Sequence, residues 1–272
     1  MSSSSSNTVY VVTGGNRGLG LGLVKALLAR PNTTVVATAR NEAAVASLQA
    51  DAGGAGATNS ALHVLQFDFS AAIPAAAVHE AVAAVVDHVD VAVLNAGLAT
   101  TAFTPAMRTT AEDLRATFEV NTIAPLLFFQ GLWPLLQKHK GGNGNASDDS
   151  NVNANAPPSP PKLAWITSSV GSIAGMEPFP GGAYGPSRAA QNWLAKALHV
   201  ENEAAGLVAF ALHPGWVQTR AGEHVAKEWN VPSGPPVTVE DSVKGMLEVI
   251  DNASRETVGG KFVTQTGEFL QW

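Results

Sequence analysis

The stretch Thr8–Gly20 (TVYVVTGGNRGLG) places a β-branched apolar run directly before a glycine-rich turn and a helical pattern. A run rich in valine and threonine is typical of a buried strand. Glycine lets the chain turn tightly, so that a helix can begin close to the end of the strand. This order predicts the first unit of a parallel sheet whose strands are connected through helices.

Short apolar runs alternate with helical patterns along nearly the whole chain. We expect strands at Thr8–Thr13, Thr34–Thr38, Ala61–Phe67, Val89–Leu94, Leu163–Thr167, Leu207–Leu212 and Lys261–Thr264. We expect helices at Gly20–Ala29, Glu42–Ala50, Ala75–Asp87, Ala111–Lys138, Tyr184–Ala205 and Val239–Ile250. Pro125 and Pro134 should bend or break the fourth of these helices. The pattern predicts one α/β domain over residues 1–272, a Rossmann-type doubly wound parallel sheet of about seven strands with helices on both faces.

Two segments fall outside this pattern. His139–Lys162 is rich in Gly, Asn, Ser and Pro and holds few apolar residues, so it predicts a flexible surface insertion between a helix and a strand. A functional docking loop is the alternative, because long loops are often functional. The serine-rich residues 1–7 predict a disordered N-terminus without the basic and apolar regions of a signal peptide.

Composition excludes several classes of function. The net charge of −6 disfavours nucleic-acid binding, which needs a basic surface. The chain has no cysteine, and no apolar run approaches the ~20 residues that span a membrane. We therefore expect no nucleic-acid or membrane partner, no metal site and a cytoplasmic location.

The turn that leads into the first predicted helix contains three glycines, Gly14, Gly18 and Gly20. Glycine allows backbone N–H groups to approach a pyrophosphate, and the helix N-terminus favours a negative charge. With Asn16, Arg17 and Leu19 between them, these residues predict a dinucleotide-binding turn. The alternative is a tight turn that only packs the helix on the sheet.

The end of the second strand reads Ala39-Arg40. A site selective for NAD places an acidic residue there, on the ribose 2′-hydroxyl. Arg40 and Arg17 instead suit a 2′-phosphate, since guanidinium groups bind phosphate through paired charged hydrogen bonds. The sequence predicts NADP(H), and two solvated surface arginines are the alternative.

Residues 183–190 read AYGPSRAA, so Tyr184 and Arg188 share one face of a predicted helix. Together with the glycine spacing, this pair resembles the short-chain dehydrogenase/reductase family, and the resemblance covers nearly the whole chain. In the family the basic residue is a lysine, which Arg188 replaces here. Further motifs lie in the family's order and imply cofactor contacts at Asp68, Asn95, Ala96, Gly97, Pro214, Gly215, Val217 and Thr219.

The resemblance implies a ketone reductase in which Tyr184 donates the proton and Ser169 orients the carbonyl, with Ser172 as a rival to Ser169. It implies that Asn121 holds a water in the proton relay; a simple hydrogen bond within the helix is the alternative. Arg188 keeps a positive charge but does not readily release a proton, so we expect reduced turnover. The alternative function is an NADP(H)-binding protein with lost or non-redox activity, such as a regulator, dehydratase or cyclase.

The family's substrate lid corresponds to residues 216–236. Trp216, Met176 and Phe179 predict an aromatic and apolar substrate wall, which favours a bulky flat ketone, unless these residues only pack the lid on the core. Three stretches are similar to fungal polyketide ketoreductases of the norsolorinic acid ketoreductase type: ALLARPNTTVVATAR, HPGWVQT and VEDSVKGMLEVIDNA. The resemblance also implies a homodimer or homotetramer.

Overall fold

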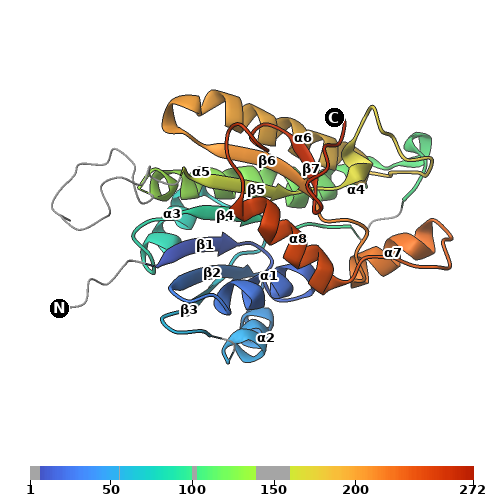
Figure 1. The fold of residues 1–272 in the computed structure, drawn as a ribbon. Coiled ribbons are helices and arrows are strands. Elements are labelled where there is room, and N and C mark those ends of the chain that lie inside the picture. Colours follow the sequence, from blue (N-terminus) through green and yellow to red (C-terminus); the bar gives the residue numbers. More distant parts are fainter. Residues whose placement is uncertain (1–6, 55, 100–102, 139–159) are drawn as a thin grey trace, which may run out of the picture.

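A seven-stranded parallel sheet with helices on both faces forms the body of the protein (Figure 1). The computed structural model describes residues 7–54, 56–99, 103–138 and 160–272. The strands are β1 (Thr8–Val12), β2 (Thr33–Ala39), β3 (Ala61–Gln66), β4 (Val91–Leu94), β5 (Lys162–Ile166), β6 (Val208–His213) and β7 (Phe262–Thr264). The predicted doubly wound α/β fold is confirmed.

The strand order is β3-β2-β1-β4-β5-β6-β7, and every neighbouring pair is parallel. The chain first adds strands on one side of β1 and then, from β4 onward, on the other. Ligands of such sheets bind in the crevice at the carboxyl ends of the strands, where the order reverses. The fold therefore directs attention to the loops after β1 and β4.

Alternate residues of the strands face two separate cores. Tyr10 and Val12 pack with α1 (Gly18–Leu28), α2 (Glu42–Ala52) and α8 (Val239–Asp251). Val9 and Val11, one position away, pack on the opposite face. That face is covered by α3 (Ala75–Ala83), α5 (Ala124–Leu136) and α6 (Tyr184–Glu201). This alternation fixes the register of the central strand, because a slip of one residue would exchange its two faces.

The predicted helix Ala111–Lys138 is divided into α4 (Ala111–Phe118), a π-helical turn η2 (Glu119–Ile123) and α5. The N–H group of Ala124 donates to the carbonyl of Glu119, five residues back. Pro125 has no N–H group and cannot make the next α-helical bond, which explains a wider turn at this point. Pro134 lies inside α5 without breaking it, so only the first proline interrupts the helix.

Other element boundaries also differ from the expectations. Helix α6 ends at Glu201, and a separate 3-10 turn η4 (Glu203–Ala205) follows it. Two further 3-10 turns, η1 (Ala106–Arg108) and η3 (Ser169–Gly171), lie in the loops after β4 and β5. Helix α7 (Arg220–Glu228), within the expected lid, was not predicted. Its first turn contains Gly222, which weakens a helical pattern in sequence.

The two segments expected to be flexible lie mostly outside the described residues, which omit 1–6 and 139–159. Their described ends are ordered. Asn7 donates hydrogen bonds to the Thr34 hydroxyl and the Asn59 carbonyl. Lys162 begins β5, so it belongs to the sheet and not to the predicted insertion.

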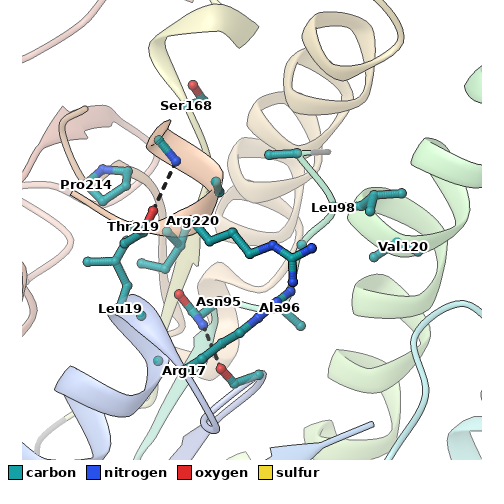
Figure 2. A pocket seen from close by; sticks show the side chains of 18 of the residues that line it. Arg17, Leu19, Asn95, Ala96, Leu98, Val120, Ser168, Pro214, Thr219 and Arg220 are labelled. Carbon is teal, nitrogen blue, oxygen red and sulfur yellow. Dashed lines mark hydrogen bonds between the residues drawn. The ribbon is translucent and has the colours of Figure 1, made fainter. Parts of the chain in front are cut away.

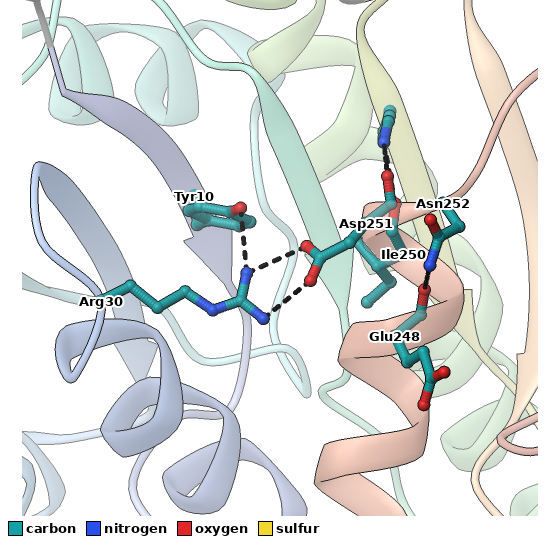
Figure 3. Close-up of polar contacts among 7 residues, drawn as sticks. Tyr10, Arg30, Glu248, Ile250, Asp251 and Asn252 are labelled. Atoms are coloured by element: carbon teal, nitrogen blue, oxygen red, sulfur yellow. Dashed lines mark hydrogen bonds and ion pairs between the residues drawn. The ribbon is translucent and has the colours of Figure 1, made fainter.

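A polar cluster anchors the end of α8 to β1 and β5 (Figure 3). Arg30 makes a two-pronged ion pair with Asp251 at 2.9 and 2.8 Å. Lys162 Nζ donates to the carbonyls of Ile250 and Asp251, and its positive charge suits a helix C-terminus. Among the described residues, no helix has the length and apolar character to cross a membrane.

Candidate active site

A cavity of about 830 Å³ opens at the carboxyl ends of the central strands, as the strand order predicts (Figure 2). All the predicted cofactor residues line it: Gly14, Asn16, Arg17, Gly18, Leu19, Gly20, Arg40, Asp68, Asn95, Ala96, Gly97, Tyr184, Arg188, Pro214, Gly215, Val217 and Thr219. Ser169, Phe179 and Trp216 also line it. The fold thus brings residues from distant parts of the sequence to one cavity.

The glycine-rich turn is shaped by two close backbone approaches. Gly14 has φ of 68°, and a Cβ atom on it would lie 3.1 Å from Ala96 Cα. A Cβ atom on Gly20 would lie only 2.0 Å from the Gly14 carbonyl oxygen. A side chain at Gly20 would therefore disrupt the turn and the start of α1 together.

Hydrogen bonds fasten this turn to the end of β4. The Thr13 hydroxyl accepts from the N–H groups of Asn95 and Ala96, each at 2.9 Å. Asn95 Nδ2 donates to the carbonyls of Thr13 and Gly14 at 2.9 and 3.3 Å. The motif after β4 thus holds the cavity floor in place, in addition to lining it.

The end of the cavity beside the glycine-rich turn is positively charged. Arg17 and Arg220 point into the cavity, the first from the turn before α1 and the second from the start of α7 (Figure 2). Neither guanidinium has a hydrogen bond or ion pair within the described ranges. Arg40 lines the same end; its charge helps to lower the pKa of Asp68, after the larger effect of hydrogen bonds from the Ser70 hydroxyl and N–H. Unpaired guanidinium groups in one cavity favour a phosphate-bearing ligand. Arg220 was not among the predicted site residues.

Tyr184 and Arg188 lie on the first turns of α6. The centre of the Arg188 guanidinium is 4.7 Å from the centroid of the Tyr184 ring, within the range of a cation–π contact. Arg188 is only 6% exposed, and its Nη1 atom donates to the Ile166 carbonyl at 3.0 Å and to Gln191 Oε1 at 2.6 Å. Its Nε atom is buried and has no partner among the described residues. The guanidinium is therefore held in one position beside the tyrosine.

Two glycines make room for this arginine. A Cβ atom on Gly97 would lie 2.5 Å from Arg188 Nη2, and a Cβ atom on Gly171 would lie 2.7 Å from Arg188 Cβ. Any side chain at either position would require the arginine to move. Gly97 thus leaves room for the guanidinium itself, whereas Gly171 lets the loop after β5 approach the backbone of α6.

The two candidate serines have different surroundings. Ser169 lines the cavity, and its N–H group donates to His213 Nδ1 at 3.1 Å. The Ser172 hydroxyl donates to the Gln271 carbonyl at 2.7 Å and accepts from the Gly175 N–H group at 2.9 Å. Ser172 is not among the lining residues, and the role of Ser169 toward a substrate stays a prediction.

His213 lines the cavity and was not predicted as a site residue. Burial lowers the pKa of His213 to about 4, so the ring is neutral at pH 7 and its Nδ1 atom can accept from Ser169. The folded pKa is below the ordinary value of 6.5, so protonation opposes folding.

We expect the stability contributed by neutral His213 to be fully present above pH 6.5 and to decline as the pH falls toward 4. Urea unfolding at pH values across this range should show a smaller loss of stability in His213→Gln than in the wild type. An identical pH dependence of the two proteins would contradict the burial of a neutral ring.

Asn121 does not line the cavity. It is fully buried in the π-helical turn, where its Oδ1 atom accepts from the Leu98 N–H group at 2.6 Å. Its Nδ2 atom donates to the Leu98 carbonyl and the Ser187 hydroxyl, each at 3.0 Å. The side chain fastens the loop after β4 to α6, and its role in a proton relay stays a prediction.

An aromatic wall continues from Tyr184 into the lid. Trp229 stacks on Phe179 with a centroid distance of 4.8 Å and meets Phe103 edge-on at 5.6 Å. Phe103 in turn lies 5.7 Å from Tyr184. Met176, predicted on this wall, is 74% exposed and lies outside the lining, because the loop turns its side chain toward solvent. Trp229 belongs to the predicted lid segment 216–236 and joins this wall.

The chain resembles known oxidoreductases over nearly its whole length. Residues 8–144 match the family model described as short chain dehydrogenase. The chain is 36% identical to the short-chain dehydrogenase RED3 of Pyricularia oryzae, over 98% of this chain and 100% of that protein. It is also 36% identical to the norsolorinic acid ketoreductase of Aspergillus parasiticus, over 97% of this chain and 91% of that protein. The chain belongs to the short-chain dehydrogenase/reductase family, as the sequence motifs predict.

Solved structures agree with this assignment. The carbonyl reductase Sniffer of Drosophila melanogaster matches with a TM-score of 0.75 and 28% identity, covering 98% of this chain and 100% of that one. The NADPH-bound carbonyl reductase from chicken fatty liver gives the same values. The protein is therefore an oxidoreductase of a family that uses a nicotinamide cofactor and small-molecule substrates.

Proposed function

We propose that the protein is an NADPH-dependent reductase of bulky aromatic ketones to secondary alcohols. The observation that carries the proposal is one cavity in which Tyr184, Ser169 and Arg188 lie between a cationic glycine-rich end and an aromatic wall. The norsolorinic acid ketoreductases among the relatives support the substrate class. Membership of the family supports a homo-oligomer and a cytoplasmic location as further parts of the proposal.

The residues of the cavity fit a dinucleotide. Gly14 and Gly20 let the turn pack closely on Ala96 and on itself, so that the start of α1 lines the cavity, where its dipole would favour a pyrophosphate. Arg17 and Arg40 would hold the 2′-phosphate, and Arg220 would reach the pyrophosphate from the lid. When bound, the reduced nicotinamide supplies the hydride for the carbonyl carbon.

The side chains around the substrate carbonyl supply the proton and the hydrogen bonds. Tyr184 donates its phenolic proton to the developing alkoxide, and the Ser169 hydroxyl holds the same oxygen by a hydrogen bond. Arg188 places a fixed positive charge against the Tyr184 ring and so stabilises the phenolate that remains. His213 keeps the Ser169 backbone in position.

We expect Arg40→Ala to raise the Kd for NADPH by roughly 10- to 100-fold and to leave the Kd for NADH nearly unchanged, because charge-assisted phosphate bonds contribute about 1.5–3 kcal/mol. Arg220→Ala serves as the matched comparison and should weaken both cofactors by similar factors, since both carry a pyrophosphate. Cofactor fluorescence titration of the wild type and of both variants measures the six dissociation constants. An equal rise in the Kd for NADPH and for NADH in Arg40→Ala would contradict the assignment of NADP(H).

A second candidate function follows from the replacement of the expected lysine by Arg188, whose Nη1 atom already donates to Ile166 and Gln191. It is an NADP(H)-binding protein without redox turnover. NADPH oxidation, followed by absorbance against a panel of flat aromatic ketones, separates the two. Tight NADPH binding without oxidation, for ketones shown to bind, would favour the second function.

A further inference from the structure

Glu177 is a carboxylate on the cavity wall that the proposed chemistry does not use. It lies in the loop between η3 and α6, is half-buried, and lines the cavity. Across the residues that the structure describes, it makes no hydrogen bond and no ion pair. A half-buried carboxylate without a partner loses part of its hydration, which a hydrogen-bond donor on a ligand would replace.

The chain places Glu177 at the substrate end of the cavity. It is two residues before Phe179, so their Cα atoms lie within about 7 Å of each other. Phe179 stacks on Trp229, and ring contacts continue through Phe103 to Tyr184. The carboxylate therefore belongs to the same wall as the aromatic rings that lead to the proton donor.

The charges around the cavity decide which ligand group suits Glu177. Four arginines line the cavity: Arg17, Arg40, Arg188 and Arg220. They disfavour a cationic substrate, while Glu177 itself disfavours an anionic group beside it. The other lining carboxylate, Asp68, is held by Ser70. A neutral hydrogen-bond donor on an apolar frame satisfies both conditions.

We propose that Glu177 is a substrate-recognition residue that accepts a hydrogen bond from a hydroxyl group on the aromatic frame of the ketone. The substrate class is then a neutral, ring-hydroxylated aromatic ketone. This inference rests on the proposed ketone reductase and specifies its substrate.

The test compares tetralones that carry a hydroxyl, a methoxy or a carboxylate group at the same ring positions. The wild type should prefer the best hydroxytetralone over its methoxy counterpart by about 10- to 100-fold in kcat/KM, as expected for a hydrogen bond to a charged acceptor. Glu177→Ala should reduce this preference to below about threefold. Glu177→Gln should raise kcat/KM for the carboxylated ketone, since it removes the repulsion.

Two controls keep the outcomes separate. Glu112→Gln, at an exposed position on α4 outside the cavity lining, should leave all ratios unchanged. Calorimetric titration of the ketones into the complex with NADP⁺, in which no reduction can occur, measures the same preference without turnover. Preferential binding of hydroxytetralones that Glu177→Ala abolishes supports the inference even if no ketone is reduced, which would reject only the proposed reductase. The inference would be overturned by either of two results. One is that Glu177→Ala lowers kcat/KM and binding equally for all ketones; the other is that the wild type shows no preference for hydroxytetralones.

Discussion

Replacing Tyr184 with phenylalanine should lower kcat for ketone reduction by about 10²- to 10⁴-fold, the usual contribution of a positioned general acid. The substitution removes one oxygen atom and keeps the ring that contacts Phe103 and the Arg188 guanidinium. The cavity should therefore keep its shape, and the Kd for NADPH should change by less than about threefold. Steady-state kinetics and cofactor titration measure the two effects.

The chain offers a matched control, because it contains only two tyrosines. Tyr10 lies in β1, and its hydroxyl is 3.5 Å from Arg30 Nη1 in the cluster at the end of α8 (Figure 3). Tyr10→Phe should leave kcat unchanged, since the residue does not line the cavity. Activity of Tyr184→Phe within tenfold of the wild type would rule out Tyr184 as the proton donor.

The sequence predicts the sheet, and the residues at the glycine-rich end of the cavity, because their signals are local. The run Thr8–Val12, the glycines after it and the Ala39-Arg40 pair each lie within one strand–turn unit. Such units have a nearly fixed geometry, so the spacing of residues is enough to place them at the carboxyl edge of the sheet.

The substrate end is less predictable because it depends on contacts between distant loops. His213 accepts from the N–H group of Ser169, which is 44 positions away, and no periodicity indicates that pairing. Trp229 and Phe179 stack only because α7 folds against the loop before α6. Arg220 joins the cavity for the same reason, since α7 begins directly after the predicted Thr219.

The interpretation of Arg188 depends on the sequence and the structure together. The resemblance to the family implies that it replaces a lysine, and the structure places Gly97 and the Gln191 acceptor against its guanidinium. The arrangement favours a positive charge fixed beside Tyr184 over a group that transfers a proton itself.

Arg188→Met should therefore lower kcat/KM by about 10²- to 10³-fold, the usual loss when a fixed electrostatic donor is removed. It should also destabilise the fold by roughly 1–3 kcal/mol, because the Ile166 carbonyl and the Gln191 side chain lose their donor. Arg188→Lys keeps the charge and one donor, so its kcat/KM should stay within about tenfold of the wild type. Steady-state kinetics of the two variants measures the effect of the charge on kcat/KM, and urea unfolding measures the effect of the lost contacts on stability.

Arg255→Met provides the control for packing alone. Arg255 also donates to backbone carbonyls, those of His199 and Leu207, but it does not line the cavity. Its loss should reduce stability and leave kcat unchanged. If Arg188→Met lost stability but kept kcat, the guanidinium would be a structural group only. If Arg188→Lys exceeded the wild type by more than tenfold, proton delivery would be the step that arginine limits, and the charge beside Tyr184 would not suffice for full turnover.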